Sequence, residues 1–599
     1  MQTMNKPEQP LPFPSGKSLA LAIIAGNVEN YIERFLKSFS ALTPHLYVVR
    51  ACGANLPDRT LDLARELGAV TAVYENAPDH AAWPHVDDFG AARQMAFDLA
   101  MADGHEFLMW ADTDDVIDAE SVKEIRALLT ERDFDCLYLP YRLSNNNLAP
   151  VRERIVRAGA FRWQDPIHES LRAVIENPVS FQGTAEITHL PVTHREDRPN
   201  ERNIRILESM KDPSTGGLLP RWSFYLCQEY EVTGRMEEAI STALQGIKGW
   251  QADRTTLQTC EAYELYLMLA RWATDGDAKL ALLREAWALE PWRREALALM
   301  SAAHADQGNA KETLALARMT VSLPEPRERP WTHRGGLYKW SGIYLYSMAL
   351  RMNGHFAEAD NIELQMFRNS GGMISVIHPT RGRPEQATRV RSRFLERARH
   401  PERIEYIFAF SEDDLESASI LGRFRHVITP SGNLDLLGGT MVINSNAAYR
   451  AAEGQIIVAA QDDIEPPFWW DESVVNEIRD VTQPVVLGVR DGHREDGLMV
   501  THIFTRPVPA LLGLSQGEYL CSEYRGMYSD TEFSFRAAKA GLVRPTSLTF
   551  THHHAFFGKA QMDATYEAGN KPEAYAYGEE IMRRRNPDYF GPTGTEEAR

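Results

Sequence analysis

The chain has few cysteines, no long apolar run and no excess of basic residues, and each shortage excludes a class of protein. Its five cysteines are spread over 599 residues in no metal-binding spacing, which disfavours a disulfide framework and favours the reducing cytoplasm. No apolar segment approaches the roughly 18 residues of a membrane span, and the N-terminus lacks a basic segment followed by an apolar one. We therefore expect neither a transmembrane helix nor a signal peptide.

The net charge of the chain limits the classes of partner that we expect. The sequence contains 83 acidic and 64 basic residues, and its net charge of −19 disfavours a large nucleic-acid surface without excluding a local one. The arginine-rich stretch 381–403 is the local exception. A solvated helix face explains this stretch more simply than a nucleic-acid patch, and we expect such a face.

The length of the chain exceeds what one hydrophobic core supports, so three or more domains are expected. Strand-like and helix-like segments alternate in the first and last thirds, whereas strand patterns are missing between them. This order predicts the fold class α/β, with two mostly parallel sheets separated by an all-α region. The expected parts are a flexible leader over 1–17, an α/β domain over 18–211, a helical domain over 212–370 and a second α/β domain over 371–599.

The helical region contains signs of a repeat. Gly234-Arg-Met-Glu-Glu-Ala239 is echoed by Gly354-His-Phe-Ala-Glu-Ala359, and the pairs Asp275-Gly276 and Gln307-Gly308 each fall between helical stretches. These irregular spacings resemble diverged tetratricopeptide helix pairs, and a plain helical linker is the alternative.

Two apolar segments, each expected to be a buried strand, run directly into clusters of acids. They are Glu106-Phe-Leu-Met-Trp110, followed by Asp112, Asp114 and Asp115, and Gln455-Ile-Ile-Val-Ala-Ala460, followed by Asp462 and Asp463. Open α/β sheets bind ligands at the carboxyl ends of their strands, and clustered carboxylates suit a hard divalent ion that also holds a diphosphate. Two clusters therefore predict a tandem enzyme that binds sugar nucleotides with Mn²⁺ or Mg²⁺.

Further motifs in the first α/β segment occur in a fixed order. They are Asp87-Asp-Phe-Gly-Ala-Ala-Arg93-Gln94, Asp112-Thr-Asp114-Asp115, Arg162-Trp163, Ile167-His-Glu169, and His189 followed by Arg202-Asn-Ile-Arg-Ile-Leu207. Over most of residues 18–210 this series resembles the family 2 glycosyltransferases, which have the GT-A fold. The group with helical repeats appended, such as the bacteriocin-peptide S-glycosyltransferases, is the type it most resembles.

The resemblance implies roles for the acids and for their partners in the first domain. Asp114 is expected to bind the metal ion, Asp112 to contact the nucleotide ribose or the ion through water, and Arg93 to lie near the diphosphate. His189 is expected to complete the metal site, with His194 as a competitor and a structural role as the alternative.

A base and a nucleotide contact complete the expected first site. Glu169, beside His168, is the candidate base that deprotonates the acceptor, and a plain hydrogen bond from this pair to a loop is the alternative. The family's aspartate after the second strand, which helps to hold the base or ribose, is replaced here by Ala51. Asp58, in the same run, is assigned to the nucleotide instead. The identity of the nucleotide and the activity of this half therefore stay open.

The last third resembles the same family over about residues 373–560. Its opening resembles the segment at which such domains meet the nucleotide, and an acid that binds the base or ribose belongs after its second strand. The candidate nucleotide contacts are Thr380, Arg381 and Arg383 in Ile377-His-Pro-Thr-Arg-Gly-Arg383, then Asp413, and Asp462 in the acid pair.

The candidate base of the second domain lies in Ser529-Asp-Thr-Glu532, which opens an expected helix over Phe533–Ala540. Asp530 occupies the position of the catalytic base in inverting relatives. The structural alternative, which is compatible with that role, is a capping box in which Ser529 is the N-cap and Glu532 its partner.

The histidines of Thr551-His-His-His554 follow a strand, and they are expected to supply a metal ligand beside Asp463. Alternation along an extended chain turns His552 and His554 to one side and His553 to the other. His552 and His554 are the candidates, and the choice between them stays open.

The leading hypothesis is a metal-dependent glycosyltransferase of the hexosyltransferase type (EC 2.4), with one Mn²⁺ or Mg²⁺ in each active α/β domain. It would move a sugar, with inversion, from a nucleotide-diphosphate donor to a glycan, a peptide or protein, or another acceptor, and a UDP-sugar is the favoured donor. Both domains could be active, or one could only bind. The alternative from another class is a helical-repeat interaction scaffold with one or both α/β domains non-catalytic.

Overall fold

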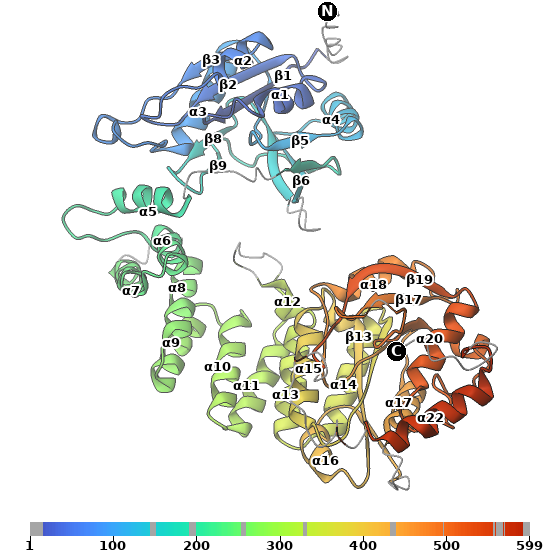
Figure 1. The fold of residues 1–599 in the computed structure, drawn as a ribbon. Coiled ribbons are helices and arrows are strands. Elements are labelled where there is room, and N and C mark those ends of the chain that lie inside the picture. The colour runs from blue at the N-terminus through green and yellow to red at the C-terminus, as the bar shows by residue number, and fades with distance from the viewer. Residues whose placement is uncertain are drawn as a thin grey trace, which may run out of the picture. The chain divides into compact units, whose positions relative to one another are not determined.

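The computed structural model describes residues 16–143, 151–190, 199–252, 259–326, 334–431, 439–494, 496–554 and 570–590, with the single residues 332, 558 and 567. The chain divides into two compact units, residues 1–265 and 266–599, and each contains one large sheet and part of the helical region (Figure 1). Most of the expected leader and the competitor His194 lie outside the described residues. No helix in the described part of the chain is long and apolar enough to cross a membrane.

The first unit is built on a nine-stranded sheet with the order β3-β2-β1-β4-β7-β6-β11-β5, in which β10 also pairs with β6. β1 runs parallel to β2 and β4, and β7 runs antiparallel to β4. β8 and β9 form a separate two-stranded sheet. The strands are β1 (Leu19–Ala25), β2 (His45–Arg50), β3 (Val70–Val73), β4 (Phe107–Met109), β5 (Asp115–Ile117), β6 (Cys136–Leu143), β7 (Val151–Arg157), β8 (Phe161–Gln164), β9 (Ser170–Ala173), β10 (Ser180–Gln182) and β11 (Ile187–His189).

Helices cover both faces of this sheet. Alternate residues of β1 point to opposite layers, so Leu21 packs in one cluster with Phe35 and Ile125, while Ala22 packs in another with Phe97. Small residues on the second face let α3 lie close against the strands. The helices are α1 (Ile32–Ser40), α2 (Thr60–Glu66), the 3₁₀ turn η1 (Pro78–His80), α3 (Phe89–Ala102) and α4 (Ala119–Glu131).

The helical region consists largely of paired helices joined by short turns. Gly234, Gly308 and Gly354 lie in the turns α6–α7, α10–α11 and α13–α14, with φ angles of 76°, 75° and 78° that favour glycine. The same turn therefore recurs in each pair, as expected for tetratricopeptide-like repeats. The helices are α5 (Pro199–Ser209), α6 (Pro220–Val232), α7 (Met236–Ala252), α8 (Thr259–Trp272), α9 (Gly276–Leu289), α10 (Glu295–Asp306), α11 (Ala310–Ser322), α12 (Gly335–Tyr338), α13 (Ser341–Met352) and α14 (Phe356–Asn369).

The second unit contains a seven-stranded sheet with the order β14-β13-β12-β15-β18-β17-β19. β12 runs parallel to β13 and β15, and β18 runs antiparallel to β15. β16 and β20 form a separate two-stranded sheet. The strands are β12 (Ile374–Pro379), β13 (Ile404–Ser411), β14 (His426–Thr429), β15 (Ile456–Ala459), β16 (Ile464–Glu465), β17 (Val486–Arg490), β18 (Ile503–Thr505), β19 (Val543–Thr549) and β20 (Thr551–His552).

The second sheet is also covered on both faces. Val376 of β12 packs with Phe394 of α15 and Trp470 of α18, whereas its neighbour Ile377 packs on the other face with Phe533 of α20. The helical elements are α15 (Pro384–Glu396), η2 (Pro401–Arg403), α16 (Leu415–Leu421), α17 (Met441–Ala451), α18 (Trp470–Ile478), α19 (Val508–Leu511), α20 (Ser529–Lys539) and α22 (Pro572–Arg585).

The expected fold class is confirmed: the protein is α/β, with two mostly parallel sheets separated in sequence by helices. The sequence pattern predicts a helix over Asn446–Glu453, whereas α17 spans Met441–Ala451. Polar residues obscure its first turns in the sequence. The Asn444 side chain accepts a hydrogen bond from Thr429, and Asn446 accepts from the backbone of Tyr519, so tertiary partners satisfy groups that would otherwise oppose a helix.

Candidate functional site

In the first unit, the acids that follow β4 meet a histidine because two short strands pair. β5 lies antiparallel to β11, and the register sets His189 opposite Asp115. The Nδ1 atom of His189 lies 3.5 Å from a carboxylate oxygen of Asp114 and 3.5 Å from one of Asp115. The predicted ligands Asp114 and His189, distant in sequence, are therefore side by side.

Asp114, Asp115 and His189 form a candidate cation site. Their possible ligand atoms lie within 4.8 Å of one another, and both carboxylates are buried. The buried Nδ1 of His189 has no hydrogen-bond partner among the described residues. The Asp115 carboxylate, with further contributions from Asp114 and Asp112, raises the pKa of His189. An orphaned imidazole nitrogen that faces two carboxylates fits a divalent ion.

Asp115 is held in place by a buried arginine that sequence reasoning missed. The Arg154 guanidinium is fully buried, lies 3.3 Å from an Asp115 carboxylate oxygen, and sits over the rings of Trp110 and Tyr141 at 4.0 and 4.4 Å. Tyr141 donates a 2.9 Å hydrogen bond to Asp115, and the backbone N–H of Asp112 donates another at 3.0 Å. Arg154 therefore compensates the charge of the carboxylate from the interior.

Replacing Arg154 by methionine is expected to destabilise the first unit by about 3–5 kcal/mol, because the change leaves Asp115 buried without its cation. The free energy of opening of β4 and β7, measured by hydrogen–deuterium exchange, should fall by that amount. Arg152→Met, an exposed site on the same strand, is the matched control and should change it by less than about 0.5 kcal/mol. Equal exchange in both variants would contradict a structural role for Arg154.

Arg93 joins the predicted nucleotide contact to the predicted base. Its side chain, on α3, donates at 2.7 Å to Asp112 and at 2.7 Å to Glu169, and it lies over the rings of Trp110 and Trp163. Burial alone would raise the pKa of Asp112, but the charges of Arg93 and Arg154, together with the hydrogen bond from Arg93, outweigh it, and the pKa lies below its usual value. Asp112 is therefore ionised and paired at neutral pH.

The loop that carries Glu169 is fixed against α3 and α6. A Cβ atom on Gly90 would lie 2.5 Å from the carbonyl oxygen of Asp165, so only glycine permits this close approach. His168 stacks on Tyr225 with ring centroids 3.7 Å apart. Burial lowers the pKa of His168 to about 4, so the ring is neutral at neutral pH.

Asp58 lies in the loop between β2 and α2, after the carboxyl end of a strand. Its carboxylate accepts hydrogen bonds from the backbone N–H of Glu29 at 3.0 Å and of Thr60 at 2.9 Å. These bonds tie the loop after β1 to the start of α2. Ala51 is buried directly after β2 and offers no polar group there. The assignment of Asp58 to the nucleotide stays a prediction.

In the second unit the same arrangement is built from different strands. β16 begins directly after Asp463 and pairs antiparallel with β20, which brings His552 to the acid. The Nε2 atom of His552 lies 3.2 Å from an Asp463 carboxylate oxygen, and its ring lies 4.9 Å from that of His554. The possible ligand atoms of these three residues lie within 4.8 Å of one another. The buried Nδ1 of His552 has no hydrogen-bond partner in the described part of the chain, which again fits an ion.

His553 points away from this group. Its Nε2 atom lies 2.8 Å from Glu465, which is also paired with Arg393. The alternation expected along the extended chain therefore holds, and it separates His553 from the two predicted ligands.

Asp462 contacts a buried histidine. The Nε2 atom of His378 lies 2.9 Å from an Asp462 carboxylate oxygen, and its Nδ1 atom lies 2.7 Å from the hydroxyl of Tyr406. His378 is fully buried on β12. The predicted nucleotide contact is thus the outer end of a hydrogen-bonded chain that reaches into the sheet.

Asp530 lies at the start of α20, where its carboxylate accepts the backbone N–H of Thr531 at 2.8 Å. Burial raises the pKa of Asp530, although the Thr531 amide and the Arg494 charge oppose that effect. The capping box was wrong: Tyr528 is the N-cap residue, and the Ser529 hydroxyl donates to the carbonyl of Gly526. The left-handed φ of 66° at Tyr528 sets a different chain entry from the one that a serine cap requires.

Glu532, which the capping box would pair with Ser529, instead accepts hydrogen bonds from Arg585 at 2.9 Å and Asn586 at 2.8 Å. Both donors lie at the C-terminal end of α22, which a sequence pattern confined to α20 cannot reveal.

The remaining predicted nucleotide contacts lie together after β12 and β13. Arg381 makes a two-point ion pair with Asp413, at 3.0 and 2.6 Å. Thr380 and Arg383 are buried beside it, and Arg383 is close enough to His554 to help lower its pKa, after burial, which is the larger cause. The loop after β12 thus lies near the candidate cation site.

Sequence reasoning placed Asp115 in the acid cluster without giving it a role, and it missed Arg154, His378 and Tyr406 as parts of these sites. Arg154 left a weak signal, since a charge stands directly before the apolar pair Ile155-Val156 in a strand pattern. His378 lay inside a motif that was recognised. Tyr406 left no signal in the sequence, because an aromatic residue in a strand is usually a core residue.

No family model matches the sequence, and no curated protein matches it. Solved structures that are similar include residues 1–349 of TarS from S. aureus, a glycosyltransferase, at 14% identity over 50% of this chain and 90% of that chain, with a TM-score of 0.24. MamA matches at 15% identity over 27% of this chain and 74% of that chain, with a TM-score of 0.19. A kinesin light chain from Podosopora anserina with TPR-like repeats matches at 17% identity over 28% of this chain and 82% of that chain, with a TM-score of 0.21. At these TM-scores the fold assignment rests on the strand orders and helix pairs of the chain itself.

Proposed function

We propose that the chain is a metal-dependent glycosyltransferase of the hexosyltransferase type (EC 2.4) that moves a sugar, with inversion, from a nucleotide diphosphate to an acceptor. The observation that carries this proposal is a repeated constellation. The first four strands of each sheet in chain order lie side by side in the order third, second, first, fourth, as β3-β2-β1-β4 and β14-β13-β12-β15. In each unit an antiparallel pairing, β5 with β11 or β16 with β20, brings a histidine to the acids that follow the fourth strand. Asp114 and Asp115 are buried and Asp463 is partly buried. Removing carboxylates from water costs free energy, and a fold that gathers acids and histidine twice at the same place favours a functional site over a structural accident.

Asp530 is the proposed base of the second head. It would take the proton of an acceptor hydroxyl while that oxygen forms a bond to the anomeric carbon and the bond from that carbon to the diphosphate breaks. Asp463, His552 and His554 would hold Mn²⁺ or Mg²⁺, which would neutralise charge on the departing diphosphate. Arg383 lies beside them and adds positive charge.

The two heads differ in their candidate bases. Glu169 is engaged in an ion pair with Arg93 at 2.7 Å, so the guanidinium occupies the carboxylate that an acceptor hydroxyl would need. The raised pKa of Asp530 brings that carboxyl closer to the operating pH of a base. We therefore assign transfer to the second head. The first head binds a nucleotide sugar, and Ala51 favours a reduced activity there.

The partners follow from this assignment. UDP-sugars are the favoured donors on the resemblance to family 2 enzymes, and a glycan, peptide or protein is the favoured acceptor. Paired helices of the tetratricopeptide type are suited to holding an extended peptide. The structure shows none of the five cysteines in a disulfide, which supports the proposed cytoplasmic location.

Release of nucleoside diphosphate from UDP-, GDP-, CDP- and dTDP-sugars with Mn²⁺ tests the function. Asp462→Ala should lower release by about 10–100-fold, because it removes a nucleotide contact in the transferring head. Asp114→Ala is the matched variant in the first head and should leave release by the second head within about twofold. Turnover that falls only in Asp114→Ala would reverse the assignment of heads. Absence of metal-dependent turnover with every donor and acceptor would favour the interaction scaffold.

A further inference from the structure

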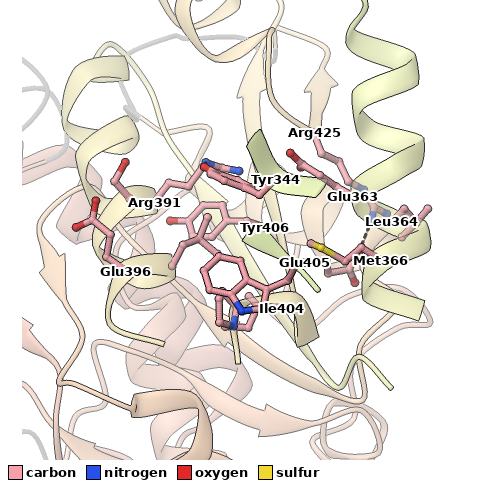
Figure 2. A pocket seen from close by; sticks show the side chains of 14 residues that line it. Tyr344, Glu363, Leu364, Met366, Arg391, Glu396, Ile404, Glu405, Tyr406 and Arg425 are labelled. Carbon is pink, nitrogen blue, oxygen red and sulfur yellow. Dashed lines mark hydrogen bonds and ion pairs between the residues drawn. The ribbon is translucent and has the colours of Figure 1, made fainter. Parts of the chain in front are cut away.

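A cavity of about 250 Å³ lies within the second unit and is lined by none of the candidate metal ligands or nucleotide contacts. Figure 2 shows Arg391, Tyr344 and Tyr406 gathered on one side of it and Leu364 and Met366 on the other. The helices α13 and α14 supply one part of the wall, and α15 and the beginning of β13 supply the rest. The acids Asp462 and Asp463, in contrast, follow the end of β15.

Arg391 is a buried cation in this wall. The stretch 381–403 was expected to be a solvated helix face, but Arg391 is only 5% exposed and lies 4.4 Å over the ring of Phe424. It donates to the hydroxyl of Tyr344 at 3.0 Å, and its Nε has no acceptor among the described residues. No carboxylate in the described part of the chain is within ion-pair distance of it. Burial would lower the pKa of Arg391, but Tyr344 and the more distant Glu363 raise it. A buried cation with an unsatisfied donor and no directly paired carboxylate is costly without a ligand.

The acids that line the cavity are engaged elsewhere. Glu363 accepts hydrogen bonds from Ser347 and Arg351, at 2.6 and 2.9 Å. Glu405 is paired with Arg425 at 2.5 Å. Of the lining acids only Glu396 is exposed, at the end of α15. None of the lining acids is therefore paired directly with Arg391.

Apart from these acids, Ser392 and the paired Arg425, the rest of the wall is apolar or aromatic. Trp340, Tyr344, Leu364, Met366 and Leu395 face the same space as Arg391. Mostly apolar walls with a few polar groups are typical of sites for small organic ligands, and the volume suits a ring with a short side chain. We propose that this cavity binds a small organic carboxylate whose apolar body lies against these side chains and whose carboxylate pairs with Arg391, and that it is an effector site of the second head.

The effector role follows from one side chain that the cavity and the catalytic face share. Tyr406 lines the cavity, and its hydroxyl lies 2.7 Å from His378, which in turn lies 2.9 Å from Asp462. An occupant beside Tyr406 is therefore two hydrogen bonds from the proposed nucleotide contact. Small shifts pass along such a chain because His378 is fully buried and closely packed. This part of the inference rests on the proposed function.

Calorimetric titration of the full chain with 3-phenylpropionate, and with 3-phenylpropionamide as the neutral analogue, tests the site. We expect one saturable site that prefers the acid by at least about tenfold, equivalent to about 1.4 kcal/mol. Arg391→Met should weaken binding of the acid by at least about tenfold, whereas Arg389→Met, an exposed charge on the same helix, should change it by less than about twofold. Leu364→Trp fills the cavity, keeps Arg391, and should abolish binding even if Arg391→Met folds poorly.

Two results would overturn the binding site. One is that the wild-type chain binds the acid and the amide with equal affinity, or that the wild-type chain and the Leu364→Trp variant bind the acid with equal affinity. The other is no saturable binding of the acid up to about 10 mM, which is weaker than any useful effector affinity.

The effector role is tested by the rate of nucleoside diphosphate release with and without saturating 3-phenylpropionate. The rate of the wild-type chain should change by at least about twofold, and Tyr406→Phe should bind the acid without responding to it. Binding with an unchanged rate would overturn the effector role. Absence of turnover without the acid would count against the proposed function alone, and the calorimetric result on the site would stand.

Discussion

Asp463→Ala is expected to reduce metal-dependent sugar transfer by at least about a hundredfold, because it removes the carboxylate that faces both His552 and His554. The affinity for Mn²⁺, measured by calorimetry, should fall with the rate. A high Mn²⁺ concentration should recover part of the lost activity, since the remaining ligands are in place. Full activity at low Mn²⁺ would contradict the proposed metal site.

The adjacent histidines provide a matched pair for the same experiment. His552→Ala should weaken Mn²⁺ affinity by about 10–100-fold, because His552 lies beside Asp463. His553→Ala removes an identical side chain one residue away, but that side chain pairs with Glu465 and should change the affinity by less than about twofold. Equal losses would mean that the peptide segment, rather than one imidazole, matters for the ion.

Asp530→Asn is expected to lower kcat by about 10²–10⁴-fold and to leave the KM for the donor nearly unchanged, because a general base acts in the transition state and not in donor binding. Asparagine keeps the size and the hydrogen bond from Thr531 but cannot accept the proton. Steady-state kinetics with saturating acceptor separate the two parameters. Asp588→Asn is the control. Asp588 is an exposed acid that pairs with Lys539 of α20, the helix that carries Asp530, and its replacement should alter neither kcat nor KM.

The pH profile adds a second test of Asp530. The carboxyl must be ionised to accept a proton, and burial raises its pKa above the usual value. Activity should therefore rise with pH as Asp530 loses its proton, over a range higher than that of an exposed aspartate. This acid limb of kcat/KM should disappear in Asp530→Asn. A limb that persists unchanged would assign the titration, and the base, to another group.

The sequence was sufficient for the features that depend on local chemistry. Buried strands such as Leu19–Ala25 and Ile404–Ser411 are recognisable from their continuous apolar residues. Glycines such as Gly234 and Gly354 indicate turns that need a left-handed backbone. The acids Asp114 and Asp463 were found because they directly follow such strands, at the edge where α/β sheets bind ligands. Helix ends were less certain, as α17 and the N-cap of α20 show.

Only the tertiary structure decided which distant side chains meet. The pairing of β5 with β11 brings His189 to Asp115, and the pairing of β16 with β20 brings His552 to Asp463, because strand register is set by non-local hydrogen bonds. The burial of a side chain likewise depends on which elements pack around it. The sequence alone therefore suggests that Arg154 and Arg391 are surface charges, although both are buried. The sequence by itself therefore determined the strands, the turns and the acids, and the folded chain determined their partners and their charges.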